Sequence, residues 1–202
     1  MSISTYAELQ TAVGNWLNRA DLTARIPEFI ELFEARVKRD LRVRQMEKRA
    51  TAETVSGTDY IGLPADYLEA RSLHLNTDPK RQLQFMPPSE YRSRWMGSET
   101  GKPKVFAIVG DEIRLAPTPD SAYETEMDYY AFSVLSDSNT TNWLLTDYPD
   151  MYLAGALVEA WSYARNEAKA GEWRMKLDRA WAELEISDQD ARYVGPLVMR
   201  AI

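Results

Sequence analysis

The stretch NWLLTDYPDMYLAGALVEAWSYA, residues 142–164, decides the fold. Within its last part, residues 151–164, only Glu159 and Ser162 are polar. A helix that is apolar on nearly every side must be buried on nearly every side. The stretch therefore predicts a central helix, with Pro149 in its first turn. We expect it to pack against other helices of the same chain, or against those helices and a neighbouring copy.

Three further helices are predicted to surround it. Thr5 with Glu8 forms a capping box for the first, which should end near Asn18. Pro27 suits the first turn of the second, where its missing N–H costs nothing. Apolar residues recur in all three at helical spacing: Leu9, Val13, Trp16 and Leu17; Ile26, Ile30, Phe33, Val37 and Leu41; Trp173, Leu177, Ala180, Trp181 and Leu184.

Two details of the helix ends are also predicted. Thr146 or Asp147 is expected to cap the central helix, because both side chains accept hydrogen bonds from free N–H groups. Residues 166–171 (NEAKAG) are expected to break the chain between the central helix and the last one.

The pattern changes from Ala50 onward, where glycine and proline separate short β-friendly runs. Residues 104–116 predict a hairpin around a Gly110-Asp111 turn. Residues 124–132 predict another strand, and residues 89–95 a short helix. The middle of the chain is therefore predicted to be a small, mostly antiparallel β module.

Together these patterns predict an α+β, mainly α, single domain over residues 1–202. A four-helix bundle is formed by residues 1–49 and 146–191, because amphipathic helices must bury their apolar stripes. Residues 50–135 form an inserted, small antiparallel β module. Residues 192–202 remain as a tail.

Composition excludes several classes of protein. The formal net charge of −7 argues against a sequence-nonspecific nucleic-acid binder. The absence of cysteine excludes disulfides, thiolate metal sites and a cysteine nucleophile. Residues 151–164 are too short for a membrane span, which needs about 20 apolar residues. We expect no signal peptide, no membrane contact and a cytosolic site of synthesis.

No catalytic site, metal site or cofactor is predicted. The single histidine, His74, has no partner at triad or ligand spacing and is interpreted as structural or surface. Asp147 and Asp150 admit a cation site, but helix-start capping is favoured because a Ca²⁺ loop needs more oxygen ligands.

Residues 36–49, RVKRDLRVRQMEKR, carry seven basic residues against Asp40 and Glu47. One interpretation is a solvated helix end that complements the helix dipole. The other is contact with nucleic acid or an acidic partner. Because arginine suits bidentate pairing with carboxylate or phosphate, the candidate contact residues are Arg36, Arg39, Arg42 and Arg44.

The tail is apolar although Gly195-Pro196 stops any helix. A segment of this kind outside the bundle is a candidate docking segment that becomes ordered in an assembly. The candidate residues for docking onto a partner or a neighbouring copy are Tyr193, Val194, Leu197, Val198, Met199 and Ile202.

The whole layout resembles the head–tail adaptor (connector) proteins of tailed bacteriophages. Four pieces carry the resemblance: TYAELQTAVGNWLNRADLTARIPEFIELFEARVKRDLR (5–42), IGLPADYLEARSLHLN (61–76), GKPKVFAIVGDEIRLAPTPD (101–120) and NWLLTDYPDMYLAGALVEAWSYARN (142–166). None of them is a catalytic signature, and their order is what is specific. The resemblance stops being useful near Arg192.

The resemblance implies a virion structural protein and not an enzyme. It implies a homo-oligomeric ring, typically a dodecamer, that binds the portal protein on one face and a tail or nozzle protein on the other. It further implies weak contact with packaged DNA in a channel, a place at the head–tail junction of the virion, and assembly in the host cytoplasm. The alternatives are a neighbouring head-completion or tail-completion protein and, less favoured, a nucleic-acid-binding protein.

A closed ring needs two different patches that meet at a fixed rotation. Tyr152, Trp161 and Tyr163 of the central helix are therefore predicted to contribute to the contact between subunits. The competing interpretation is that this helix is wholly internal to its own bundle.

Overall fold

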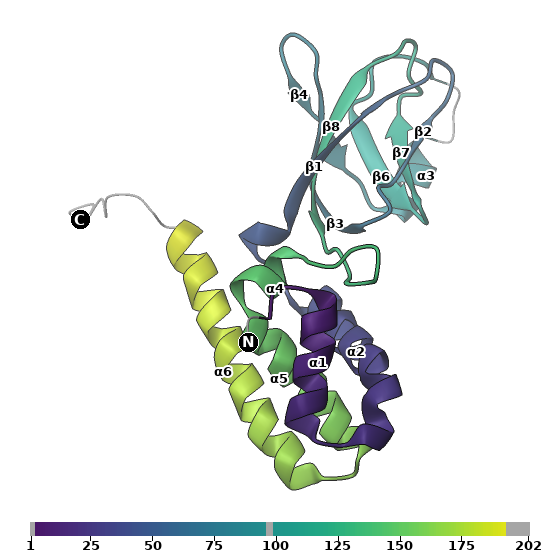
Figure 1. Cartoon of the computed structure of the whole chain (residues 1–202). Coiled ribbons are helices and arrows are strands. Elements are labelled where there is room, and N and C mark those ends of the chain that lie inside the picture. Colours follow the sequence, from purple (N-terminus) through teal and green to yellow (C-terminus); the bar gives the residue numbers. More distant parts are fainter. Residues whose placement is uncertain (1–2, 96–98, 193–202) are drawn as a thin grey trace, which may run out of the picture. The chain divides into compact units, whose positions relative to one another are not determined.

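The computed structural model describes residues 3–95 and 99–192 of the 202 (Figure 1). It confirms the α+β class. The chain divides into two compact units: a helical unit of residues 1–45 and 133–202, and a β unit of residues 46–132. Each unit has its own core.

The helical unit is arranged around the helix predicted at its centre. That helix, α5 (Pro149–Tyr163), contacts α1 (Tyr6–Leu17), α2 (Ile26–Asp40) and α6 (Glu167–Arg192). Short elements join or flank them: η1 (Ala20–Arg25), η2 (Arg44–Met46) and α4 (Trp143–Asp147). In Figure 1, α2 and α6 run in one direction and α1 and α5 in the opposite one.

Nearly every residue of α5 is buried, as its apolar composition predicted. The buried set is continuous from Met151 to Val158 and resumes at Ala160 and Trp161. Gly155 allows a close approach to α2, because a Cβ atom there would overlap the ring of Phe33. The close contact between α2 and α5 thus depends on one missing methyl group.

The predicted ends of α1 and α2 are confirmed. Thr5 and Glu8 form the capping box, and Asn18 ends α1 in the left-handed conformation. Pro27 lies in the first turn of α2, whose predicted stripe is buried from Ile26 to Val37, with Leu41 just after the helix.

The predicted cap of α5 is wrong. Thr146 and Asp147 are themselves helical, because residues 143–147 form the separate helix α4. The Asn142 side chain caps α4 by accepting a hydrogen bond from the Leu145 N–H at 2.9 Å. The N-cap of α5 is Tyr148, which makes no side-chain capping bond.

The break before the last helix is shorter than predicted. The chain turns at Arg165, which has a φ of 55°, and α6 already begins at Glu167. The Asn166 side chain accepts a hydrogen bond from the Lys169 N–H at 3.1 Å, so it satisfies one of the free donors at the start of α6.

The β unit consists of two four-stranded sheets. The first has the order β1-β8-β3-β4 and the second the order β2-β7-β6-β5. Their bounds are β1 (Glu47–Glu53), β2 (Tyr60–Gly62), β3 (Tyr67–Leu75), β4 (Arg81–Gln82), β5 (Gln84–Phe85), β6 (Val105–Val109), β7 (Glu112–Ala116) and β8 (Glu124–Ala131), with the helix α3 (Pro88–Trp95).

Side chains of both sheets form the core of this unit, among them Leu73, Leu115 and Met127. The predicted hairpin is β6–β7, turning at Gly110, whose φ of 61° favours glycine. The predicted strand at residues 124–132 is β8, and the predicted short helix is α3. The pairing of β5 with β6 is parallel, and the other strand pairs are antiparallel among the described strands.

A buried polar network joins α2, α5 and the segment before α4. The Glu34 carboxylate accepts hydrogen bonds from the Leu135 N–H at 2.8 Å and from the Tyr152 hydroxyl at 2.7 Å. The Tyr152 hydroxyl also accepts from the Asn142 side-chain amide at 2.7 Å, which donates in addition to the Ser133 carbonyl. Glu34 is 2% exposed and Tyr152 is fully buried. The network therefore fixes the chain where it re-enters the helical unit.

Burial raises the pKa of the Glu34 carboxyl, and the hydrogen bonds from Leu135 and Tyr152 only partly offset this. Because the folded chain then binds the proton more tightly than the unfolded chain does, stability should fall as pH rises from the ordinary glutamate pKa of about 4.3 through the raised value. In Glu34→Gln this loss should be absent. Urea unfolding of both proteins across this range, followed by circular dichroism, measures the difference, and parallel stability curves would contradict the expectation.

Candidate assembly surface

Tyr152, Trp161 and Tyr163, predicted at a subunit contact, lie in three different environments. Tyr152 is fully buried in the network described above, so its side chain offers no surface to a neighbour. Trp161 is 6% exposed, with the Lys169 ammonium 4.1 Å from its ring centroid. Tyr163 is 51% exposed and packs its ring against Phe29 of α2. Of the three residues, Tyr163 is the one with substantial accessible surface.

The basic residues at 36–49 do not form one helix end. The helix α2 holds Arg36, Lys38 and Arg39, and Arg42 follows it. Arg44 lies in η2, and Lys48 and Arg49 lie on β1. The strand begins at Glu47, three residues before the predicted start of the β module. The run is therefore shared between the two compact units.

Several of its members are paired with carboxylates or with the backbone. Arg36 forms an ion pair with Glu159 of α5. Arg42 donates to the carbonyls of Lys38 and Leu41, which closes the end of α2. The Arg44 N–H donates to the buried Asp188 carboxylate of α6 at 2.7 Å.

The same holds for the two basic residues on β1. Lys48 pairs with Asp66 at 2.7 Å, and Arg49 pairs with Asp128 at 3.1 Å and with Glu126 at 3.4 Å. The hydroxyl of Tyr129 donates to the same Asp66 carboxylate, and burial together with that carboxylate raises the pKa of Tyr129 to about 12. The sequence run looks like a single basic patch, whereas the fold divides it between two units and places Arg36, Lys48 and Arg49 in local ion pairs.

Two tryptophans from the predicted stripes lie at the surface between α1 and α6. Trp16 is 57% exposed, and its ring meets that of Trp173 edge-on, with the centroids 5.3 Å apart. The Lys176 ammonium lies 3.8 Å from the centroid of the Trp173 ring. These residues line a groove of about 470 Å³ whose floor includes Leu153 and Ala154 of α5.

The helix α6 has a second apolar stripe that the sequence analysis missed. Its inner side buries Leu177 and Leu184. Met175, 68% exposed, and Ile186, 58% exposed, lie on the opposite side together with the exposed Ala182. At 3.6 residues per turn these three share one face. This outer stripe could have been predicted from the sequence, because Met175, Ala182 and Ile186 share a helical spacing and do not fit the inner stripe.

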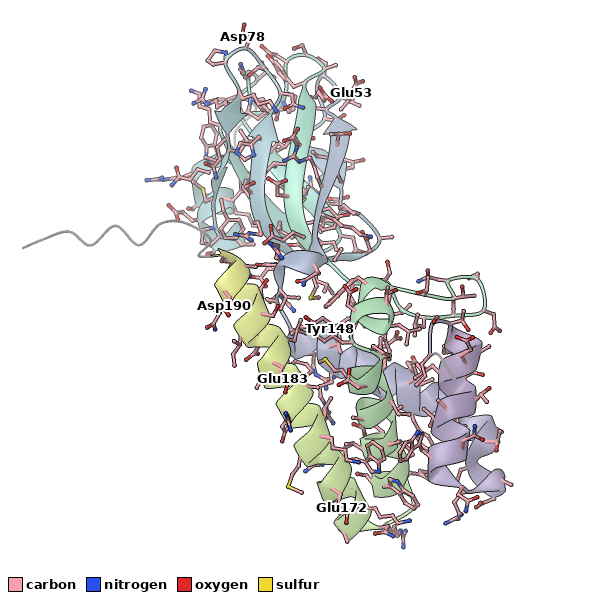
Figure 2. The ribbon with its side chains drawn as sticks, turned by 60° about the vertical axis from the view of Figure 1, so that its left-hand side comes forward. Glu53, Asp78, Tyr148, Glu172, Glu183 and Asp190 are labelled. Atoms are coloured by element: carbon pink, nitrogen blue, oxygen red, sulfur yellow. The ribbon has the colours of Figure 1, made fainter. Side chains whose placement is uncertain are left out.

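Acidic side chains border this outer stripe. Glu183 and Asp190 both lie on α6 (Figure 2), and because they are about two turns apart they share one side of the helix. Residues 182–192 contain four acidic residues and one arginine. Asp188 is the buried one among them, bound to the Arg44 N–H and to Arg192. The C-terminal half of α6 therefore presents an apolar face with an acidic border.

The outer side of α2 has the complementary pattern. Leu32 is 54% exposed, Ala35 is half-buried, and Arg39 is exposed one turn further along. Lys38 lies beside Arg39. The C-terminal half of α2 thus presents a smaller apolar face with a basic border. This face differs from the face of α2 that carries the buried stripe.

Two further expectations concern residues or sites elsewhere. The docking tail, from Tyr193 to Ile202, lies outside the described residues. Within the described residues, no cluster of three or more histidine, cysteine or carboxylate side chains is arranged to hold a metal ion. His74 lies on β3, with its Nδ1 3.4 Å from the Ser72 hydroxyl oxygen.

No helix in the described part of the chain has the length and apolar character that crossing a membrane requires.

Comparison with known proteins identifies the family. A search of curated proteins gave no match. The model of the family described as SU10 adaptor protein matches residues 4–200, which covers both units and reaches into the tail, beyond the point where the sequence resemblance ended. The chain therefore belongs to the SU10 adaptor protein family, a family of phage head–tail adaptors.

Proposed function

We propose that this adaptor forms a ring below the portal of a tailed phage, joins the capsid to the tail and continues the DNA channel. The observation that carries the proposal is the family match over residues 4–200, nearly the whole chain. The helical unit supports it physically, since exposed apolar side chains such as Leu32, Met175 and Ile186 are typical of a surface that becomes covered in an assembly.

In this proposal the four long helices act as a bundle that forms the body of the ring. The ring has twelve copies, as is typical of the head–tail adaptors that the sequence resembles. It assembles in the host cytoplasm before it becomes part of the virion. Trp161 and Tyr163 remain candidates for the subunit contact. Tyr152 is withdrawn from it, because the residue is fully buried within its own unit.

Mass analysis of the purified protein, alone and then mixed with its portal ring, tests the proposal. We expect the mixture to contain the portal with a fixed number of adaptor copies. A protein that ignores the portal and instead joins the tail tube would indicate a tail-completion role. A protein that binds neither would overturn the proposal.

The tail can be tested in the same assay. Removal of residues 193–202 should weaken attachment to the portal or to the neighbouring subunit, because the segment contains the six apolar candidate docking residues and lies beyond the last described helix. Full attachment of the truncated protein would exclude the docking role. Circular dichroism of the truncated protein serves as the control for folding.

Contact with DNA should be weak and sensitive to salt. Arg36, Lys48 and Arg49 are paired with carboxylates of the same chain, and the net charge is −7, so few cations are available for phosphate. Fluorescence anisotropy with labelled duplex DNA should show little binding at 150 mM salt. Tight binding at that salt concentration would contradict both the pairing argument and a channel wall along which DNA slides.

A further inference from the structure

We infer that the ring closes through the outer face of α2 of one subunit and the outer face of α6 of the next. This inference rests on the proposed function, because it names the contact that a ring of this chain would use. A closed ring requires two different faces on each subunit. The outer faces of α2 and α6 are two such faces on one helical unit, and neither is covered by the unit's own core.

The directions of the two helices fit cyclic symmetry. In Figure 1, α2 and α6 run the same way within the helical unit. Rotation about an axis along these helices keeps their direction unchanged. In a ring whose axis runs along these helices, the α2 helix of one subunit and the α6 helix of its neighbour meet side by side and parallel, as a heterologous contact.

The apolar residues of the two faces match in size. Met175 and Ile186 project from α6 on either side of the small Ala182, and Leu32 projects from α2 beside the small Ala35. Helices pack at an axial separation of about 8–10 Å when large side chains enter the spaces beside small ones. Pairing the faces would cover the exposed side chains of Leu32 and Ile186, which would otherwise remain in water.

The charges select one register for this parallel pair. A single offset in residue number places Glu28 opposite Arg179, Ala35 opposite Ile186, and Arg39 opposite Asp190. Both charge pairs are opposite in sign, and they lie on either side of the contact between Ala35 and Ile186. Such pairs fix register and exclude wrong partners, because like charges at a contact are costly.

Forming these pairs disturbs little within each subunit. Glu28 is paired with Arg25, and Arg179 with Glu183, but all four side chains are at least 47% exposed. Exposed pairs of this kind contribute little to stability, so exchanging one partner for another costs little. The complementary faces belong to the same chain, which identifies the occupant as a second copy.

Site-directed cross-linking tests the contact, because the natural chain contains no cysteine. The variant Ala35→Cys/Ile186→Cys, assembled on its portal ring and oxidised, should give a ladder of disulfide-linked oligomers up to the closed ring. Each single variant should give no ladder, because the two faces differ. The control Thr11→Cys/Ile186→Cys uses an exposed position on α1 and should also give no ladder.

Charge exchange provides an independent test of the register. Arg39→Asp and Asp190→Arg should each reduce the occupancy of the portal ring roughly tenfold at limiting protein concentration, because each places like charges together. The combined variant Arg39→Asp/Asp190→Arg should restore occupancy. Both residues are exposed, so the thermal unfolding of each isolated variant should match that of the natural protein.

The outcomes separate the contact from the function. If the cysteine variant occupies the portal ring fully but gives no ladder, the α2–α6 contact is wrong while the adaptor function stands. A ladder from the Thr11 control, or a combined charge variant that stays defective, also overturns the proposed register. If the natural protein fails to join the portal at all, the proposed function fails and the inference fails with it.

Discussion

Tyr152→Ala should lower the free energy of unfolding of the helical unit by about 4 kcal/mol, the usual range for removing a large buried aromatic side chain. Tyr152 is fully buried, and its ring meets that of Phe33 edge-on at a centroid distance of 5.3 Å. Its hydroxyl also satisfies the Glu34 carboxylate and the Asn142 amide. The substitution therefore leaves a cavity and two buried polar groups short of a partner.

Tyr152→Phe separates the two contributions. It keeps the ring and removes only the hydroxyl, so we expect a loss of about 2 kcal/mol, because a buried carboxylate loses one of its hydrogen-bond donors. Equilibrium unfolding in urea, followed by circular dichroism, measures both changes. A loss below about 0.5 kcal/mol for Tyr152→Phe would mean that the buried network contributes little.

Tyr163→Ala is the matched control on the same helix. Tyr163 is half-exposed, with the Arg25 guanidinium 5.2 Å from its ring centroid, so its removal should cost about 1 kcal/mol or less. The two tyrosines should also differ in assembly. Tyr163→Ala should reduce occupancy of the portal ring at nearly unchanged monomer stability, whereas Tyr152→Ala should act through the fold.

Gly155→Ala should destabilise the helical unit by about 2 kcal/mol, although alanine is the better helix former by about 1 kcal/mol. A Cβ atom at residue 155 would overlap the ring of Phe33, which is fully buried and meets the ring of Tyr152 edge-on. Because the ring is fully buried, the two helices must separate or the ring must leave its preferred rotamer.

Gly171→Ala is the control for helix propensity. Gly171 lies in α6, and a Cβ atom there would meet nothing within 4 Å. We expect this substitution to stabilise the protein by about 0.5–1 kcal/mol. Thermal and urea unfolding of the two variants should therefore shift in opposite directions, and a Gly155→Ala protein as stable as the natural one would show that α2 and α5 are less closely packed than described.

The helices and the hairpin could be predicted because their signals are local. The Thr5–Glu8 capping box involves residues three positions apart, and Gly110 turns the hairpin with its own backbone conformation. The stripe of α2 also follows from the sequence, because apolar residues spaced by three or four must share one side of a helix. These predictions need no knowledge of what the elements pack against.

The cap of α5 could not be predicted in this way. Thr146, Asp147 and Asn142 are all good capping residues, and the choice depends on which residue begins a helix. Asn142 is fixed in that position by Tyr152 and by the Ser133 carbonyl, which come from other parts of the fold. The additional helix α4 and the uncapped start of α5 follow from those contacts.

By itself, the sequence determined that this protein has a helix buried on nearly every side, three amphipathic helices to cover it, and an inserted β module. Those properties follow from composition and periodicity, which are set residue by residue. Only the tertiary structure decided that Tyr152 belongs to the core, that the basic run is shared between two units, and that α2 and α6 carry complementary outer faces. The reason is that burial, ion pairing and the facing of two helices depend on residues far apart in the chain, whose proximity is created by packing.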